Sequence, residues 1–305
     1  MMKVSVCITA FNIEQYIAKA LDSVLSQKTD FDYEIVIGED KSTDTTLSIL
    51  KSYQNRYPGT IRIIENELNR GFMTNYISTI MACKGEYVAM LDGDDYWSDE
   101  NKLQKQVLFM DNNLNYSLCW HDAAIIPDGP GKRWSYAERF AGRNYDQFID
   151  LDKVIRWKVL GATSSMVFRN SLPPFPDWAH DRALGGPEFL LCFLSVQRGH
   201  LKYMHDRMSV YRIRPNSLET SISKIKKGAR NIKESEIMYS VQGDRYRSMY
   251  LGKILWNHMY LIYMFVKSGT FLDASTHVFQ FVALLPRFVY YRIKFFKCID
   301  HWKST

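Results

Sequence analysis

The stretch YVAMLDGDDYW, residues 87–97, decides the fold class of this chain. Its first five residues form a near-continuous apolar run, which is typical of a parallel strand buried on both faces. The run ends abruptly in three carboxylates, Asp92, Asp94 and Asp95. Ligands of open α/β sheets bind outside the carboxyl ends of the strands, so this acidic turn is the first candidate for a functional site.

Three strand-and-helix units precede this stretch. Short apolar runs at 3–9, 34–38 and 61–64 predict strands, and each is followed by apolar residues at helical spacing. This order predicts an α/β fold with a doubly wound, mostly parallel sheet covered by helices. The acidic pair Glu39-Asp40 also follows a predicted strand, so we expect both acidic clusters at the same edge of the sheet.

The alternating pattern loosens beyond residue 125. Turn-forming residues at 128–131 and prolines at 173–176 interrupt regular structure, and residues 161–168 predict one more strand. From residue 224 the chain becomes helical, basic and aromatic. We therefore expect a main domain over 1–223 and a helical extension over 224–305.

Composition and charge exclude several classes of protein. With 46% hydrophobic and 24% charged residues among 305, the chain is neither disordered nor collagen-like. The net charge of +6 is unevenly placed, because residues 224–305 carry 14 Lys and Arg against 5 Asp and Glu. Residues 1–223 are slightly acidic. Since nucleic-acid-binding proteins usually carry their basic surface on the main fold, we expect no nucleic-acid partner.

Cysteine spacing and hydropathy indicate the compartment. The five cysteines are far apart and form no C-x-x-C pair, which favours reduced thiols in the cytoplasm over a disulfide framework. The apolar run at 1–8 is too short for a signal peptide. No apolar run approaches the roughly 20 residues that span a bilayer. We expect a cytoplasmic protein whose contact with membrane, if any, is peripheral.

The acidic turn suggests a metal site. Carboxylates this close raise each other's pKa unless a cation neutralises them, and carboxylate oxygens favour a hard divalent ion such as Mg²⁺ or Mn²⁺. The alternative is a solvated turn at a helix start, since Ser98-Asp99-Glu100 has the residues of one. The seven histidines show neither H-x-x-x-H nor H-E-x-x-H, so we expect no zinc site.

Taken together, these segments resemble the family 2 glycosyltransferases of the GT-A fold. VSVCITAFN at 4–12 matches the opening strand of that family, and GEDKSTD at 38–44 resembles its DDGSTD segment, with Glu and Lys departing from the commonest form. NRG at 69–71 resembles its N-x-G turn, and 85–97 its DXD strand. Further on, VYRIR at 210–214 resembles a VYR-x-H stretch, with Arg where His is common.

The resemblance implies a site. Residues 1–110 would be the nucleotide-sugar-binding half and 111–223 the acceptor half. Asp40 would accept a hydrogen bond from the base, uracil being commonest, unless it is only an N-cap. The other implied nucleotide-binding residues are Thr9, Ala10, Phe11, Asn12, Asn69, Gly71, Asp92 and Gly93. The implied ligands of Mn²⁺ or Mg²⁺ are Asp94, Asp92 and, as an alternative, Asp95.

An inverting transfer also needs a base for the acceptor hydroxyl. The family places it at a helix start beyond the DXD, where Asp177, Asp181 and Glu188 are candidates. We favour Glu188, because Pro187 and an acid fit the first turn of a helix, with Asp181 second. The alternative is that Glu188 only complements the helix dipole.

Four residues are weaker acceptor-site candidates, each with a structural alternative. Trp97 could wall the donor site or simply pack in the core. His121 could face the acceptor, although a hydrogen-bonded structural histidine is favoured. Thr163 could offer a hydroxyl, or be an ordinary strand residue. Arg212, together with Arg214, could contact diphosphate, or be a solvated strand end.

The sequence thus predicts a cytoplasmic, metal-dependent, inverting glycosyltransferase of the hexosyltransferase class. It would move a sugar from a nucleotide diphosphate, UDP being commonest, to a glycan or lipid-linked acceptor in cell-surface polysaccharide synthesis. One alternative is a sugar nucleotidyltransferase, disfavoured because residues 9–14 contain neither Gly nor Lys. Another is a nucleotide-sugar-binding module without catalysis.

The carboxyl-terminal segment suggests a surface contact. Large apolar residues recur every three or four positions among basic ones, which is typical of an amphipathic helix; they are Phe281, Leu284, Leu285, Phe288, Tyr291 and Phe295. This stripe predicts peripheral contact of 270–305 with the anionic inner face of the plasma membrane. Packing on the catalytic domain or in a homodimer is the alternative. Pro286 would kink or split the helix.

Overall fold

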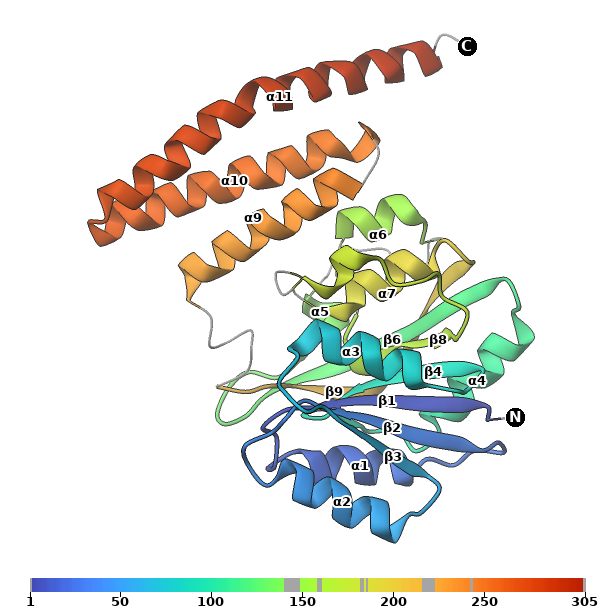
Figure 1. Cartoon of the computed structure of the whole chain (residues 1–305). Coiled ribbons are helices and arrows are strands. Elements are labelled where there is room, and N and C mark those ends of the chain that lie inside the picture. The colour runs from blue at the N-terminus through green and yellow to red at the C-terminus, as the bar shows by residue number, and fades with distance from the viewer. Residues whose placement is uncertain are drawn as a thin grey trace. The chain divides into compact units, whose positions relative to one another are not determined.

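A computed structural model describes residues 2–139, 149–157, 161–181, 184, 186–215, 223–241 and 244–303. The chain divides into two compact units. The first comprises Met1–Arg182 and Gly186–Pro215, and the second comprises Ala183–Gly185 and Asn216–Thr305. Figure 1 shows the first as a sheet covered by helices and the second as a set of long helices.

The first part of the sheet is parallel, as the sequence predicts. Its elements in chain order are β1 (Val4–Ala10), α1 (Ile17–Leu25), β2 (Tyr33–Glu39), α2 (Thr46–Arg56), β3 (Ile61–Glu65), α3 (Phe72–Ala82) and β4 (Tyr87–Asp92). The strands lie in the order β3-β2-β1-β4. Figure 1 shows α1 and α2 on one face and α3 on the other. Both faces of the sheet are therefore covered, and because the β4 side chains are buried on either face, the sequence of β4 is an almost continuous apolar run.

The sheet continues into a mixed second part. Its elements are β5 (Tyr96–Trp97), α4 (Lys102–Asn112), β6 (Tyr116–Pro127), β7 (Trp134–Ser135), α5 (Tyr136–Arg139), α6 (Leu151–Trp157), β8 (Val167–Arg169), α7 (Pro187–Ser195) and β9 (His200–Ile213). The order continues from β4 as β8-β6-β9-β5, with β7 pairing β6. β8 runs antiparallel to both β4 and β6, whereas β6 and β9 are parallel.

The strand predicted over 161–168 is only partly correct. Thr163–Ser165 forms a short 3-10 turn, η1, and the strand is confined to Val167–Arg169. The Ser165 hydroxyl donates to the Ala162 carbonyl at 2.6 Å, and the Ser165 amide donates to the same oxygen. Local bonds of this kind compete with strand pairing, which is why the Ser/Thr-rich half of the segment turns.

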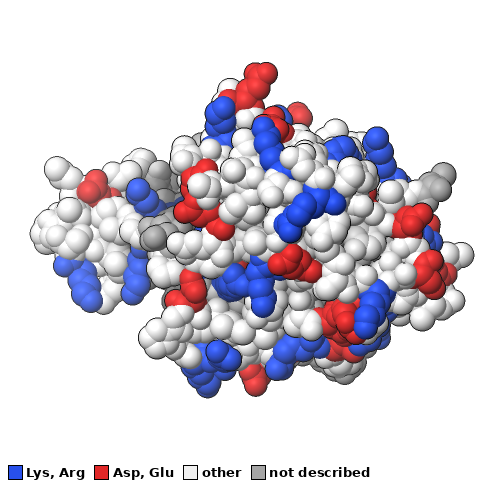
Figure 2. Space-filling model, turned by 90° about the horizontal axis from the view of Figure 1, so that it is seen from below, with Lys and Arg blue, Asp and Glu red and all other residues white. Residues whose placement is uncertain are grey.

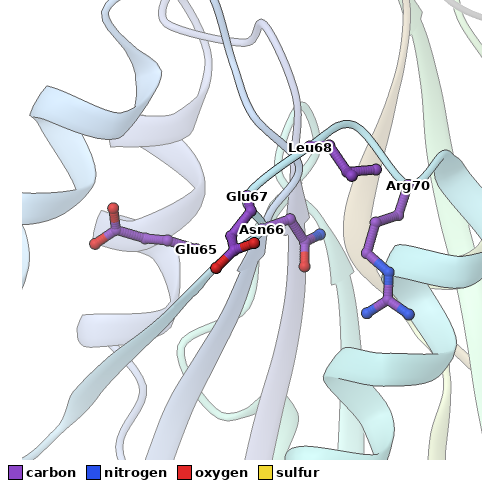
Figure 3. A pocket seen from close by; sticks show the side chains of 5 residues that line it. All are labelled: Glu65, Asn66, Glu67, Leu68 and Arg70. Atoms are coloured by element: carbon purple, nitrogen blue, oxygen red, sulfur yellow. The ribbon is translucent and has the colours of Figure 1, made fainter.

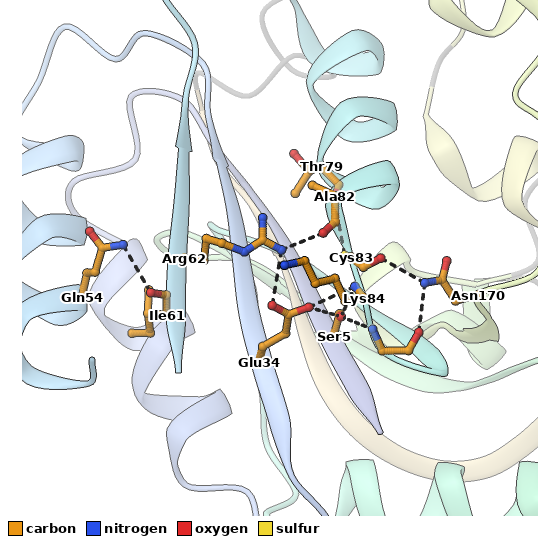
Figure 4. Close-up of polar contacts among 11 residues, drawn as sticks. Ser5, Glu34, Gln54, Ile61, Arg62, Thr79, Ala82, Cys83, Lys84 and Asn170 are labelled. Carbon is orange, nitrogen blue, oxygen red and sulfur yellow. Dashed lines mark hydrogen bonds and ion pairs between the residues drawn. The ribbon is translucent and has the colours of Figure 1, made fainter. Parts of the chain in front are cut away.

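A polar network closes the amino edge of the sheet (Figure 4). The Glu34 carboxylate accepts hydrogen bonds from the Ser5 hydroxyl at 2.6 Å and the Lys84 amide at 3.0 Å, and it pairs with Arg62 at 3.3 Å. Although burial acts in the opposite direction, these contacts hold the pKa of Glu34 below its usual value. Asn170 donates to the carbonyls of Cys83 and Gly85. The polar groups drawn at this edge are thus satisfied by one another, which is typical of a structural network.

Close packing of α3 on the sheet explains one glycine. A Cβ on Gly38, in β2, would lie 2.0 Å from the Thr79 hydroxyl oxygen and 2.6 Å from the Asn75 side-chain oxygen. Asn75 instead donates to the Gly38 carbonyl at 2.9 Å. The absence of a side chain in β2 therefore lets α3 approach the end of the strand that precedes the Glu39-Asp40 pair.

The second unit is helical from Lys224, as the sequence predicts. It consists of α9 (Lys224–Val241), α10 (Asp244–Ser268) and α11 (Phe271–Lys303), and α10 packs against both others. α11 continues as one helix through Pro286. In the part of the chain that the structure describes, no helix is both long enough and apolar enough to cross a membrane.

Charged residues alternate in sign on the face shown in Figure 2. Lys and Arg side chains lie interspersed with Asp and Glu and form no continuous basic patch on that face.

Candidate active site

The carboxyl edge of the parallel strands brings the predicted nucleotide-binding residues together. The register of β1 with its neighbours places Thr9 beside Asp92 and Ala10 beside Glu39. Ala10 is buried, whereas the next residue, Phe11, is 44% exposed at this edge. Segments far apart in sequence therefore meet at one rim of the sheet, and Phe11 presents an aromatic surface there.

Asn12 ties the first loop to the second. It has a positive φ of 49°, its amide donates to the Ser42 hydroxyl at 3.1 Å, and its side-chain oxygen accepts from the Thr43 amide at 2.8 Å. In the second loop, Lys41 also has a positive φ, of 63°. Asn tolerates this backbone region better than most residues, so Asn12 is suited to the turn itself as well as to the contacts it makes.

Asp40 is enclosed by the turn that leads into α3. Its Oδ1 accepts from the Asn66 side chain at 2.9 Å and the Arg70 amide at 2.8 Å, and its Oδ2 accepts from the Gly71 amide at 2.9 Å. Gly71 has a φ of 86°, a region that favours glycine. Asn69 donates to the Asp40 carbonyl at 3.1 Å. Asp40 therefore holds the start of α3, a role that sequence reasoning missed.

Asp40 is not the N-cap of α2, which is Thr45, and the carboxylate that contacts the start of this helix is Asp44. Asp44 accepts from the Thr46 amide at 2.9 Å, at the start of α2, and from the Glu14 amide at 3.1 Å. Asp40 and Asp44 thus anchor different helices. Whether Asp40 also contacts a base stays a prediction, and such a contact would have to share an oxygen with the bonds from Asn66, Arg70 or Gly71.

A pocket of about 340 Å³ adjoins Asp40 (Figure 3). Its lining residues are Glu65, Asn66, Glu67, Leu68 and Arg70. Asn66 links the pocket to Asp40 through its side chain, and Arg70 does so through its amide. The pocket therefore lies where β3 ends, next to the loops that carry the predicted nucleotide-binding residues.

The acidic turn after β4 is strongly perturbed. Burial first, and the nearby Asp94 charge second, raise the pKa of Asp92 to about 7. The Tyr76 hydroxyl donates to Asp92 Oδ1, and burial together with that carboxylate raises the pKa of Tyr76 well above its usual value. Gly93 is needed between the acids, because a Cβ there would lie 2.4 Å from Ile13 Cδ1 and 2.8 Å from the Thr9 carbonyl oxygen.

Asp94 and Asp95 have different surroundings. Asp94 Oδ2 lies 2.6 Å from Arg214 Nε, forming an ion pair at the end of β9. Asp95 is fully buried, and its Oδ1 accepts from the Arg212 amide at 2.9 Å. Among the described residues, Asp95 Oδ2 has no hydrogen-bond partner. Burial, then the charges of Asp94 and Asp92, raise the pKa of Asp95 well above its usual range.

The donor set at this turn suits a hard divalent cation. The charges of Asp94 and Asp92 disfavour the charged form of Asp95, and Asp95 Oδ2 is a buried oxygen that has no hydrogen-bond partner among the described residues. Within the described ranges, no three His, Cys, Asp or Glu side chains are already arranged as a ligand set. Asp92 and Asp94 could therefore hold an ion only together with ligands from outside this cluster.

Glu188 lies near the acidic turn, in the first turn of α7, which begins at Pro187 as the sequence predicts. Its Oε1 accepts from the Thr163 hydroxyl at 2.8 Å. The charge of Glu188 contributes to raising the pKa of Asp92, and a Thr163 hydrogen bond acts on that same group in the opposite sense. Thr163, in η1, thus stands between the two carboxylates. Asp181 follows the short 3-10 turn η2 (Asp177–His180).

Two weaker candidates are in the interior. Trp97 is 4% exposed, and its ring nitrogen donates to the Ser164 carbonyl at 2.9 Å. His121 is fully buried, with Nδ1 2.7 Å from the Asp122 carbonyl, and burial lowers its pKa well below the usual value. These surroundings match the structural alternatives for both residues. Whether either residue contacts an acceptor stays a prediction.

Two arginines and two tyrosines form a rim beside the acidic turn. The Arg212 guanidinium lies 5.2 Å from the Tyr16 ring centre and 4.8 Å from that of Tyr96. The Arg214 guanidinium lies 5.2 Å from the Tyr16 ring centre and also pairs with Asp94. Such contacts hold the two guanidinium groups in place, and because the rings carry no net charge, the arginines keep their positive charge. The sequence pattern identified both arginines as candidates. It gave no signal for Tyr16, or for Tyr76, which donates to Asp92.

A parallel sheet that carries a carboxylate-rich turn after its fourth strand defines the GT-A class of fold. The sequence profile described as Glycosyl transferase family 2 matches residues 5–171, more than half of the chain. The chain therefore belongs to glycosyl transferase family 2. This confirms the resemblance and the fold class that the sequence predicts.

Similar proteins include both uncharacterised and named relatives. An uncharacterised protein of Mycobacterium tuberculosis is 33% identical over 57% of this chain and 48% of its own length. The putative glycosyltransferase EpsE of Bacillus subtilis is 34% identical over 38% of this chain and 41% of its own. The chain thus spans about half or less of the length of these relatives.

Solved structures share the fold at low identity. S. aureus TarS 1-349, in complex with UDP-GlcNAc, has a TM-score of 0.59 and 19% identity, covering 84% of this chain and 72% of that one. The mannosyltransferase PcManGT of Pyrobaculum calidifontis, in complex with GDP-Man and Mn²⁺, has a TM-score of 0.50 and 14% identity, covering 96% and 83%. At these identities the likeness establishes the fold alone.

Proposed function

We propose that this chain transfers a sugar from a nucleotide diphosphate to an acceptor hydroxyl with inversion at the anomeric carbon. The observation that carries the proposal is the meeting of two carboxylates across Thr163. Asp92 belongs to the turn where family members handle the donor, and Glu188 begins a helix of the acceptor half. The donor-binding carboxylate of Asp92 and the proposed base, Glu188, would thus lie on either side of the Thr163 hydroxyl.

The nucleotide would lie along the carboxyl edge of β1 and β2. Phe11 is exposed there for stacking, and the pocket at the end of β3 offers polar groups. UDP is the proposed nucleotide, as the resemblance implies. Asp40 would shape this site by fixing the loop from Asn69 to Gly71, and an imide N–H of the base would find its acceptors in that region.

A divalent ion, Mn²⁺ or Mg²⁺, held by Asp92 and Asp94 would neutralise charge on the departing diphosphate. Asp95 is the alternative ligand that the resemblance implies. Arg212 and Arg214 lie at the same turn and would attract the diphosphate. Arg214 already pairs with Asp94 Oδ2. When the ion binds, Arg214 would therefore have to share this carboxylate with the ion or move away from it.

Glu188 would act as the base. An ionised carboxylate near the acceptor can take the proton of the attacking hydroxyl, which contributes about a hundred- to ten-thousand-fold to the rate. Thr163 would orient this carboxylate by donating to Oε1. Asp181 is the alternative base.

We further propose that the acceptor is a glycan or lipid-linked glycan of a cell-surface polysaccharide, assembled in the cytoplasm. Support comes from relatives. One is a poly(ribitol-phosphate) beta-glucosyltransferase of Bacillus spizizenii, 35% identical over 38% of this chain and 19% of its own length.

A donor panel tests this function. Saturation-transfer NMR with UDP- and GDP-sugars, with and without Mn²⁺, would identify the nucleotide that binds. Transfer to a glycan acceptor, or slow donor hydrolysis, would then follow with the same donor. Binding without either reaction would favour the nucleotide-sugar-binding module instead.

A further inference from the structure

Three residues of the apolar stripe predicted in α11 contact α10 of the same unit. Leu284 packs with Ile254 and Leu261 of α10. Phe288 lies over Gly252, with Cε2 3.2 Å from the position a Cβ would take. Tyr291 accepts a hydrogen bond from Arg247 Nη1 at 3.2 Å. These three residues are therefore contacts within the unit, whereas Leu285 of the same stripe is 41% exposed and the side chain of Phe295 lies outside the described residues.

A different set of large apolar residues is exposed on α10. It consists of Trp256, Met259, Tyr263 and Val266, and Trp256 is 67% exposed. Their spacing of three and four residues puts all four on one side of the helix. The buried residues of α10, among them Ile254 and Leu261, lie on the other side.

The exposed set continues into α11 through a tight turn. Gly269 has a φ of 78°, its amide donates to the Val266 carbonyl at 3.1 Å, and the Thr270 amide donates to the Phe265 carbonyl at 3.0 Å. α11 then begins with Phe271, which is 66% exposed, and Leu272, which is 87% exposed. Exposed Phe279 and Val282 follow. We call these eight residues, Trp256, Met259, Tyr263, Val266, Phe271, Leu272, Phe279 and Val282, the hairpin apolar set.

Chemistry and charge indicate what covers this set. Soluble monomers rarely expose so many large apolar side chains on neighbouring segments. Trp, Tyr, Phe and Leu beside cations are typical of helices that lie in the headgroup region of a bilayer. Lys267 and Arg287 are exposed on the same two helices. Residues 224–305 carry a net charge of +9, which opposes pairing with a second copy and favours an anionic surface.

We propose that the hairpin apolar set docks the chain on an anionic lipid bilayer, with the aromatic and aliphatic side chains entering the headgroup boundary. No described helix can cross the bilayer, so docking is in the plane of the membrane. This inference rests on the proposed function. It adds that the enzyme would meet a lipid-linked acceptor at the surface of a membrane.

Flotation of the full chain with vesicles tests the inference. Vesicles of phosphatidylcholine with phosphatidylglycerol should carry the protein upward at low salt, and vesicles of phosphatidylcholine alone should carry far less. Leu272→Glu with Phe279→Glu should lower the vesicle partition coefficient at least ten-fold. The matched control is Met81→Glu with Leu114→Glu, which changes equally exposed apolar residues of the first unit and should leave partitioning unchanged.

Charge is tested separately from apolar contact. Lys267→Gln and Arg287→Gln should each lower binding to anionic vesicles by about five-fold and leave binding to neutral vesicles unchanged. All substituted side chains are exposed, and circular dichroism of each variant checks that the helices are retained.

Three results would overturn the inference. They are a wild-type chain that does not float, a Leu272→Glu/Phe279→Glu variant that floats like wild type, and a dimer in sedimentation equilibrium that this variant abolishes. The last result would assign the surface to a second copy. Flotation needs no donor, so a chain that floats without transferring sugar refutes only the proposed function, and one that transfers without floating refutes only this inference.

Discussion

Arg214 Nε lies 2.6 Å from Asp94 Oδ2, and both side chains are four-fifths buried or nearly so, at 17% and 20% exposure. A candidate metal ligand is thus already paired with a cation of the chain itself. Asp94 follows β4 in the chain, and Arg214 directly follows β9. A divalent ion that binds Asp94 must therefore compete with a guanidinium.

This competition predicts that Arg214→Gln binds Mn²⁺ more tightly than wild type in the absence of donor. Removing the guanidinium leaves the Asp94 carboxylate without its counter-charge, so a metal ion gains a stronger ligand. Electron paramagnetic resonance of free Mn²⁺ measures the affinity. Arg212→Gln is the control, because Arg212 contacts Asp95 through its backbone amide, which glutamine retains. Equal Mn²⁺ affinity in wild type and Arg214→Gln would argue against Asp94 as a ligand.

Metal removal should abolish transfer. EDTA would strip the ion from Asp92 and Asp94, so charge on the departing diphosphate would not be neutralised, and added Mn²⁺ should restore turnover. Asp94→Ala should weaken UDP binding mainly when metal is present, as measured by calorimetry. Full activity in EDTA would refute the metal assignment.

Asp40→Ala should destabilise the fold by about 1–2 kcal/mol in denaturant unfolding, because the amides of Arg70 and Gly71 lose their acceptor at the start of α3. Asn69→Ala, which removes one bond to the Asp40 carbonyl, should cost less. If Asp40 served only the base, Asp40→Ala would weaken UDP binding while the free energy of unfolding stayed the same.

Lys102 makes the stability depend on pH. The residue is fully buried, its Nζ has no hydrogen-bond partner among the described residues, and the nearest favourable group is the Trp97 ring at 4.0 Å. Burial lowers the pKa of Lys102 from 10.5 to about 7. Between these pH values the unfolded chain holds a proton that the folded chain has lost, so the free energy of unfolding should rise with pH.

The matching variant is Lys102→Met, which keeps the length of the side chain and removes the charge. It should be more stable than wild type below pH 7, and the advantage should shrink by several kcal/mol as pH rises from 7 towards 10, since each unit of pKa difference is about 1.4 kcal/mol. Urea unfolding at several pH values measures this. A constant difference between the two proteins would contradict the lowered pKa.

The parallel half of the fold could be predicted because each of its strands is a short apolar run followed by a helical pattern. The β4 run, buried on both faces, is the clearest case. The segment at 161–168 was harder, since its Ser and Thr residues form local bonds that override strand propensity. The candidate residues at strand ends could be predicted because the alternation of strands and helices indicates a parallel sheet. The carboxyl ends of such strands meet at one edge, where ligands bind.

Contacts between distant residues could not be predicted. The Asp94–Arg214 pair joins positions 120 residues apart, and the bonds from Arg70 and Gly71 to Asp40 depend on how α3 enters the sheet. In α11, helical periodicity correctly indicated an apolar stripe. It could not tell that Leu284 packs on α10 while Leu272 and Phe279 remain exposed. A repeat of three and four residues shows which residues share a face of the helix, but it does not show what that face contacts.

The most direct test of the proposed chemistry is the turnover of Glu188→Gln measured together with its donor affinity. Glutamine keeps the size of the side chain and can still accept the Thr163 hydrogen bond, but it cannot take a proton at neutral pH. We predict that turnover falls about a hundred- to ten-thousand-fold while donor affinity is unchanged. Asp181→Asn, measured alongside, should retain turnover. Near wild-type turnover in Glu188→Gln would contradict the account and transfer the role of base to Asp181.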